Sequence, residues 1–319
     1  MESKLLRFIS AVFFCSFSFC FLFFYQVDVM TVTQHIASHG KTFYNPIVGA
    51  ILITVILQLL QNSIDVFVKI PNRVFALTYF PPIVLLSLIS SIRSDVEYNN
   101  FAISQWWWIL LILFPIYIFI VFFVKRYEPY AQQQRNIGVF SQSMWRNLFI
   151  LFLLFFFVGY FSNNDPYFHK RAKIEHLIDQ RQYTKALSVV KTLSHTDSVI
   201  SMLTIYAAAR SNKLTNHLFS YPLVGSSHVM RPLYVHSYLQ PDSIILKNTL
   251  LSANYQLMGF LLDRNLSQFI RYLPQYYPSK SVLPRYYKEA VRIYSLHLKD
   301  SIPSPPYPHD SYYQYYFNK

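Results

Sequence analysis

The stretch WRNLFILFLLFFFVGYF, residues 145–161, separates two halves of the chain that differ in composition. Four other long apolar runs precede it, and a half of ordinary soluble composition follows it. The whole chain is 53% hydrophobic and only 13% charged, whereas soluble domains average about 25% charged residues. We therefore expect a transmembrane domain over residues 1–162 and a separate domain after it.

Five apolar runs are long enough to cross a bilayer, since a spanning helix needs about 20 such residues. They lie at about residues 8–25, 46–64, 74–92, 106–124 and 145–161. The first run has 18 uncharged residues, more than the core of about 7 to 15 residues in a signal peptide, so we expect an uncleaved span. Pro81 and Pro82 fall in the middle of the third run, where neighbouring helices must satisfy the freed backbone groups.

Lysine and arginine are concentrated in alternate loops, and cytoplasmic loops carry the excess of these residues. The N-terminus and the loops after spans two and four hold eight of them: Lys4, Arg7, Lys69, Arg73, Lys125, Arg126, Arg135 and Arg146. The two opposite loops hold only Lys41 and Arg93. This asymmetry predicts a multi-pass protein of the cytoplasmic (inner) membrane with a cytoplasmic N-terminus. Five crossings then place the second half in the periplasm.

Gln58, Asn62 and Asp65 fall on one face of the second span. Because polar groups inside a bilayer are costly and often functional, this stripe raises the hypothesis of a transporter subunit with an ion path. We favour a structural interpretation, in which Asp65 lies at the interface with Lys69 four residues on and the amides bond a neighbouring span.

The second half predicts amphipathic helices joined by short polar turns, and it contains almost no strand-like alternation. The expected helices cover residues 172–180, 184–193, 199–211, 214–219, 243–262, 266–273 and 282–297. The aromatic-rich region 272–294 is either a contact face or core, and we favour core. Residues 301–319 contain Pro303, Pro305, Pro306 and Pro308, so we expect a flexible tail rich in proline and tyrosine.

Three short segments repeat within this half: QYTKAL at Gln182, KLTNHL at Lys213 and NLSQFI at Asn265. Each follows a polar turn and begins a second helix, as in the helical hairpins of tetratricopeptide (TPR) repeats. The separations of 31 and 52 residues depart from the regular TPR period. We therefore predict an irregular TPR-like domain over residues 163–300, with a non-repetitive helical bundle as the alternative.

Three further segments carry a resemblance to a family: FYNPIVGAILITVILQLLQ from Phe43, QVDVMTVTQH after the first span, and YAAARSNKLTNHLFSYP from Tyr206. They resemble a bacterial family of multi-pass membrane proteins that is known as a domain of unknown function. The resemblance implies membrane spans followed by TPR-like helices. It implies no activity, and the likeness fails at the C-terminal tail.

Several classes of site are excluded or disfavoured. The six glycines are too scattered for a phosphate-binding loop. His35 and His39 have the spacing of two zinc ligands on a helix, with Asp28 upstream, but a loop explains them as well. Cys15 and Cys20 lie inside the first span and act as small hydrophobic residues. The basic surplus lacks a nucleic-acid motif, so we expect no nucleic-acid partner.

Asp28 also occupies the position, just after the first span, of the acidic residue in membrane glycosyltransferases that use lipid-linked sugars. Such enzymes usually have about twice as many spans, so this interpretation is an alternative only. We expect no catalytic, cofactor-binding or metal site. The favoured hypothesis is a non-enzymatic membrane protein that lies in the lipid bilayer and presents a TPR-like domain to a protein partner.

Overall fold

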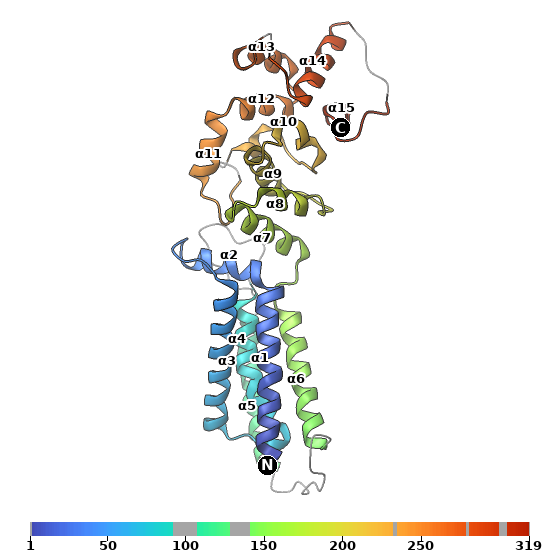
Figure 1. The fold of residues 1–319 in the computed structure, drawn as a ribbon. Helices are drawn as coiled ribbons and strands as arrows, with labels where there is room; N and C mark the ends of the chain where they lie inside the picture. The colour runs from blue at the N-terminus through green and yellow to red at the C-terminus, as the bar shows by residue number, and fades with distance from the viewer. Residues whose placement is uncertain are drawn as a thin grey trace. The chain divides into compact units, whose positions relative to one another are not determined.

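The computed structural model describes residues 2–91, 107–127, 141–231, 235–278, 281–299 and 305–318. These residues form helices and no strand, which confirms the predicted all-α class (Figure 1). The chain divides into two compact units, Met1–Asp165 and Pro166–Lys319. Several predicted features lie outside the described residues: Ile92 and Trp106 at span ends, the loop charges Arg93 and Arg135, and tail residues 301–304.

Four segments of the first unit are long and apolar enough to cross a membrane, and each overlaps a predicted span. They are α1 (Glu2–Cys20) with the π-helical turn η1 (Phe21–Tyr25), α3 (Pro46–Val68), the 3-10 segment η2 (Asn72–Tyr79) with α4 (Phe80–Ile89), and α6 (Gln142–Phe161). The remaining predicted span, 106–124, coincides with α5 (Trp107–Tyr127).

Local sequence determines where α3 begins and ends. The Asn45 side chain accepts hydrogen bonds from the amides of Ile47 and Val48, both at 3.1 Å, and Pro46 occupies the first helical position, where no amide hydrogen is needed. The helix ends because Lys69 adopts a left-handed conformation with φ 49°. Its inner face then joins a core shared by α1, η2, α4 and α6, which includes Phe14, Leu57, Tyr79, Ile83 and Leu151.

Two details of this unit differ from the sequence predictions. Pro81 and Pro82 lie in the first turn of α4, directly after η2, and not in mid-helix. Their missing amide hydrogens therefore cost little, because the first turn of a helix has free amides in any case. The predicted polar loop after the first span is instead the helix α2 (Val27–Ala37).

The second unit consists of short helices around one core. In chain order they are α7 (Pro166–Asp179), α8 (Tyr183–Val190), α9 (Ser198–Arg210), α10 (Leu214–His217), η4 (Leu218–Ser220), η5 (Ser227–Met230), α11 (Asp242–Leu251), α12 (Ala253–Leu262), α13 (Leu266–Tyr276), α14 (Arg285–His297) and α15 (Tyr312–Phe317). The single helix expected over 243–262 is interrupted at Ser252, whose backbone is extended. Tyr286 and Tyr287 are fully buried, so both belong to the core.

The three repeated sequence segments share one backbone turn. Arg181, Asn212 and Arg264 immediately precede them, and each has a left-handed φ between 55° and 59°. In each turn the next amide donates to the carbonyl five residues earlier, which is the Schellman pattern at a helix end. The three bonds are Gln182 N to Leu177 O (2.8 Å), Lys213 N to Ala208 O (2.7 Å) and Asn265 N to Phe260 O (2.8 Å). The pairs α7–α8, α9–α10 and α12–α13 are therefore hairpins with the same turn.

The tail differs from its prediction over residues 312–317, which form α15. Ser311 caps this helix by accepting a hydrogen bond from the amide of Gln314 at 3.2 Å. Tyr312 is fully buried in the core of the second unit. The prolines predicted to prevent a helix all precede Ser311, so none of them interrupts α15.

Candidate functional site

The side-chain amides of α3 form a hydrogen-bond network. Gln58 Nε2 donates to Gln61 Oε1 at 2.8 Å and to Asn62 Oδ1 at 3.1 Å. Gln61 Nε2 in turn donates to Thr78 Oγ1 of η2 at 2.8 Å, and the Cys15 thiol of α1 lies 3.6 Å from Gln58 Oε1. Gln58 therefore contacts the neighbouring span α1, as predicted, whereas the bond to η2 comes from Gln61, which the sequence stripe did not include. Hydrogen bonds of this kind hold membrane helices together.

Asp65 pairs with a different cation from the one predicted. Its carboxylate lies 2.8 Å from Arg7 Nη1 of α1, and the same guanidinium lies 5.1 Å from the centre of the Phe75 ring. The proposed partner Lys69 ends the helix in a left-handed conformation, so the geometry of an i, i+4 helical pair does not apply to it. The polar stripe is thus satisfied by protein groups on three segments, which favours the structural interpretation over an ion path.

The candidate residues after the first span lie on and beside α2. Asp28 is in the first turn of this helix, where a carboxylate is stabilised by the helix dipole. His35 lies in the last turn, with its ring centre 6.4 Å from that of Phe43, and His39 follows in a left-handed turn. Within the described residues, no group of three or more His, Cys, Asp or Glu side chains is arranged to hold a metal ion.

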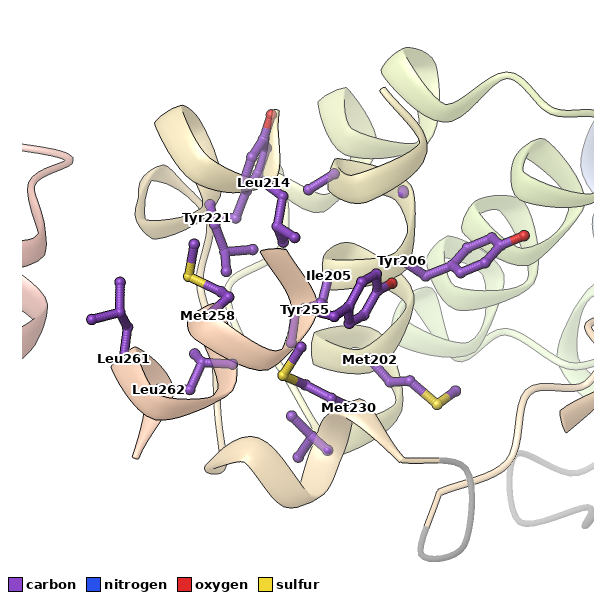
Figure 2. Close-up of a cluster of buried hydrophobic side chains, with 14 of the residues drawn as sticks. Met202, Ile205, Tyr206, Leu214, Tyr221, Met230, Tyr255, Met258, Leu261 and Leu262 are labelled. Carbon is purple, nitrogen blue, oxygen red and sulfur yellow. The ribbon is translucent and has the colours of Figure 1, made fainter. Parts of the chain in front are cut away.

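The second unit contains an open cavity of about 570 Å³ beside α12, which we call the α12 cleft. It is lined by Ser227, Met230, Arg231, Leu246, Tyr255, Gln256, Gly259, Phe260, Asp263 and Tyr272. Figure 2 shows Met230 and Tyr255 in the buried cluster from which the floor of the cleft is built. A volume of this size is within the usual range for ligand pockets.

Glycine and aromatic rings give the α12 cleft its shape. A Cβ atom at Gly259 would lie 3.6 Å from Ser227 Cβ and 3.7 Å from Met230 Sδ, so the missing side chain leaves space at the floor. The rings of Phe260 and Tyr272 stack with centres 5.5 Å apart and form a wall. This combination of small floor and aromatic wall suits an inserted apolar side chain.

The two charged residues of the α12 cleft differ in their partners. Asp263 Oδ1 accepts a hydrogen bond from the Ser227 amide at 2.7 Å, so this carboxylate has a structural role. Arg231 is exposed, and its side chain makes no hydrogen bond or ion pair within the described part of the chain. The cleft therefore presents an exposed cation, and the second half of the chain carries eighteen Lys/Arg against nine Asp/Glu.

A buried carboxylate elsewhere in this unit has structural partners. Glu175 of α7 is fully buried, and its Oε2 accepts hydrogen bonds from the Ser237 hydroxyl and from the Leu239 amide at 3.0 Å. Arg171 Nε lies 3.6 Å from Glu175 Oε1, and its guanidinium is 3.8 Å from the centre of the Tyr238 ring. These contacts fix residues 235–240 against α7, and they leave Glu175 no open access for a substrate.

The sequence analysis did not single out Gln61, Glu175 or the α12 cleft residues. Gln61 adjoins the Gln58 stripe in the sequence. The two groups that donate hydrogen bonds to Glu175, on Ser237 and Leu239, lie more than 60 residues away in the chain. Searches against protein-family models, curated proteins and solved structures find no match to this chain.

Proposed function

We propose that this chain is an integral membrane protein that presents a helical, TPR-like binding domain to a protein partner outside the cytoplasm. The observation that carries the proposal is the α12 cleft, which combines the exposed cation of Arg231 with an aromatic wall in a unit built from repeated hairpins. Stacked hairpins present surfaces that bind peptides and proteins without chemistry.

The membrane part of the proposal has five crossings, with α5 as the fourth. Support comes from its 21 residues, from the basic residues Lys125 and Arg126 in its last turn, and from a largely exposed apolar surface that includes Leu111, Ile112, Phe114, Phe119 and Phe122. With the N-terminus in the cytoplasm, as the loop charges indicate, the second unit lies in the periplasm of a bacterium. Alkaline phosphatase fused after Ser162 should then be active, and an inactive fusion would exclude this topology.

The binding proposal is tested by photocrosslinking in intact membranes. A photoreactive amino acid at Gln256, on the cleft, should give a discrete crosslinked product, whereas the same residue at Lys185 on α8 should not. Gly259→Leu should abolish the Gln256 product, because the leucine side chain fills the floor of the cleft. Gly259→Ala is the matched control, since its single methyl group makes only ordinary contacts. Equal products from both positions, or a product that survives Gly259→Leu, would reject binding in the cleft.

A further inference from the structure

The turn between α12 and α13 carries the sequence DRNLS, residues 263–267. Asn265 is followed two residues later by a serine, which is the Asn-x-Ser/Thr acceptor pattern of N-linked glycosylation. No other asparagine of the chain has a serine or threonine in that position. Asp263 adds the carboxylate that bacterial oligosaccharyltransferases bind two residues before the asparagine. The segment therefore contains every residue that such an enzyme recognises in an acceptor.

The hairpin turn exposes the side chains that the enzyme must reach. Asp263, Asn265 and Ser267 are all exposed, whereas Leu266 between them belongs to the buried core. The backbone is not yet helical at the asparagine, since Arg264 has φ 55° and Asn265 has φ −90° and ψ 77°. An enzyme that modifies a folded protein needs its target on a surface turn, and the tip of the α12–α13 hairpin meets this requirement.

The two polar atoms of the Asn265 side chain have different roles. Oδ1 caps α13 by accepting a hydrogen bond from the Gln268 amide at 3.1 Å. Nδ2 makes no hydrogen bond within the described residues, and neither does the Ser267 hydroxyl. Glycosylation replaces one hydrogen of Nδ2 and leaves Oδ1 unchanged. A glycosylated Asn265 can therefore still cap the helix, so the modification is compatible with the fold.

We propose that Asn265 is an acceptor for N-linked glycosylation by an oligosaccharyltransferase. Asn265 Nδ2 attacks the anomeric carbon of an oligosaccharide that is carried on polyprenyl pyrophosphate. A C–N bond forms, the bond from that carbon to the pyrophosphate oxygen breaks, and one Nδ2 proton passes to a base of the transferase. The Asp263 carboxylate and the Ser267 hydroxyl hold the turn on the enzyme. Because these enzymes act outside the cytoplasm, the inference rests on the topology given under the proposed function.

The first test uses purified full-length protein in detergent, a purified bacterial oligosaccharyltransferase and a polyprenyl-pyrophosphate-linked oligosaccharide. Mass spectrometry should find the glycan on the tryptic peptide of residues 265–271. Asn265→Asp should abolish the modification without loss of folding, because aspartate caps a helix as well as asparagine does. Ser267→Ala should also abolish it, whereas Ser267→Thr should retain it. Asp263→Asn, which keeps an acceptor for the Ser227 amide, should lose most of the modification.

The second test expresses the full chain in a bacterium that carries the same enzyme and donor, with the phosphatase fusion after Ser162 in a parallel strain. An active fusion together with a glycan on Asn265 supports the proposal. An active fusion with unmodified Asn265 would overturn the acceptor site and leave the topology standing, whereas an inactive fusion would overturn both. A glycan that persists in Asn265→Asp, or transfer only to urea-unfolded protein in the first test, would also overturn the proposal, because the folded hairpin would then not be the acceptor.

Discussion

The Tyr312 hydroxyl donates a hydrogen bond of 3.1 Å to the carbonyl of Leu261, near the C-terminal end of α12. Carbonyls at a helix end have no partner within their own helix. The Tyr315 hydroxyl donates a second hydrogen bond, of 3.0 Å, to the next carbonyl, that of Leu262. Arg264 adds hydrogen bonds to the carbonyls of Tyr315 and Asn318 at 3.0 and 2.9 Å. The tail is therefore part of the folded unit.

Tyr312→Ala should destabilise the second unit by about 3 to 5 kcal/mol, as large-to-small changes of buried aromatic residues do. Tyr312→Phe, which loses only the hydrogen bond, should cost about 1 to 2 kcal/mol. The measurement is the urea concentration at the midpoint of unfolding of the full chain in detergent, monitored by circular dichroism. Tyr313→Phe is the control, because Tyr313 is on the same helix but only half-buried. An equal loss of stability in Tyr313→Phe and Tyr312→Ala would contradict the docking of α15.

Arg181→Gly should stabilise the α7–α8 hairpin by about 1 kcal/mol, because glycine adopts a left-handed φ without the cost that other residues incur. The Arg181 side chain is exposed, so little is lost with it. Arg264→Gly relieves the same backbone strain, but it also removes the hydrogen bonds from the guanidinium to the Tyr315 and Asn318 carbonyls. It should therefore not stabilise the second unit. Thermal unfolding of both variants checks this difference, and a destabilised Arg181→Gly would show that the turn is not strained.

Two glycines should respond to alanine in opposite directions. Gly259→Ala should stabilise by about 0.5 to 1 kcal/mol, since alanine favours the helix and the new methyl group makes ordinary contacts. At Gly49 the new Cβ would lie 2.2 Å from Tyr44 Cε2, so this buried ring must move, at a cost of about 1 to 3 kcal/mol. Thermal unfolding in detergent measures both variants, and the same sign for both would refute these packing arguments.

Glu175→Ala should be among the most destabilising single changes in the second unit. It leaves Arg171, the Ser237 hydroxyl and the Leu239 amide without their buried acceptor, and breaking such a pair costs about 3 to 5 kcal/mol. Glu175→Gln keeps one acceptor oxygen and should lose less. Hydrogen exchange at residues 235–240 reports the effect locally, and unchanged protection of this segment in Glu175→Ala would disprove the role of the carboxylate.

Alkaline pH should unfold the second unit. Burial raises the pKa of Tyr255, Tyr286, Tyr287 and Tyr312 above the ordinary value of 10.0. The unfolded chain therefore loses these protons first, so stability is complete below pH 10.0 and declines as the pH rises towards the folded values. Urea midpoints measured from about pH 8 to about pH 11 test the direction. The decline should be shallower in Tyr255→Phe, and a flat profile in the wild-type protein would contradict it.

The sequence predicted those features that depend on local pattern. Four spans are visible because lipid requires long apolar runs, and the second helices of the hairpins begin where the repeated segments begin. The left-handed turns could not be predicted at Arg181 and Arg264, because glycine is the residue that usually indicates this conformation. Helix α15 could not be foreseen because its stability comes from Leu261, Glu289 and Phe219, which are distant in the sequence.

The polar stripe of Gln58, Asn62 and Asp65 could likewise be predicted only as far as local pattern reaches. Helical periodicity correctly placed Gln58, Asn62 and Asp65 on one face, because it concerns neighbours within one helix. Periodicity carries no information about the facing helix, so Arg7 was missed as the partner of Asp65, and Thr78 was missed as the partner of Gln61. The α12 cleft has no local signature, because its lining comes from several short segments.

Asn147 of α6 joins two segments that are far apart in the chain. Its Oδ1 accepts a hydrogen bond from the Ala76 amide at 2.7 Å, and its Nδ2 donates to the carbonyls of Asn72 and Arg73. These backbone groups flank Val74, whose non-helical backbone (φ −134°, ψ 32°) interrupts the hydrogen bonding within η2. During biosynthesis, residues 72–79 therefore complete their hydrogen bonding only after α6 has been made and inserted. The third hydrophobic segment should therefore not reach its final conformation in the membrane until the chain has been synthesised beyond residue 147.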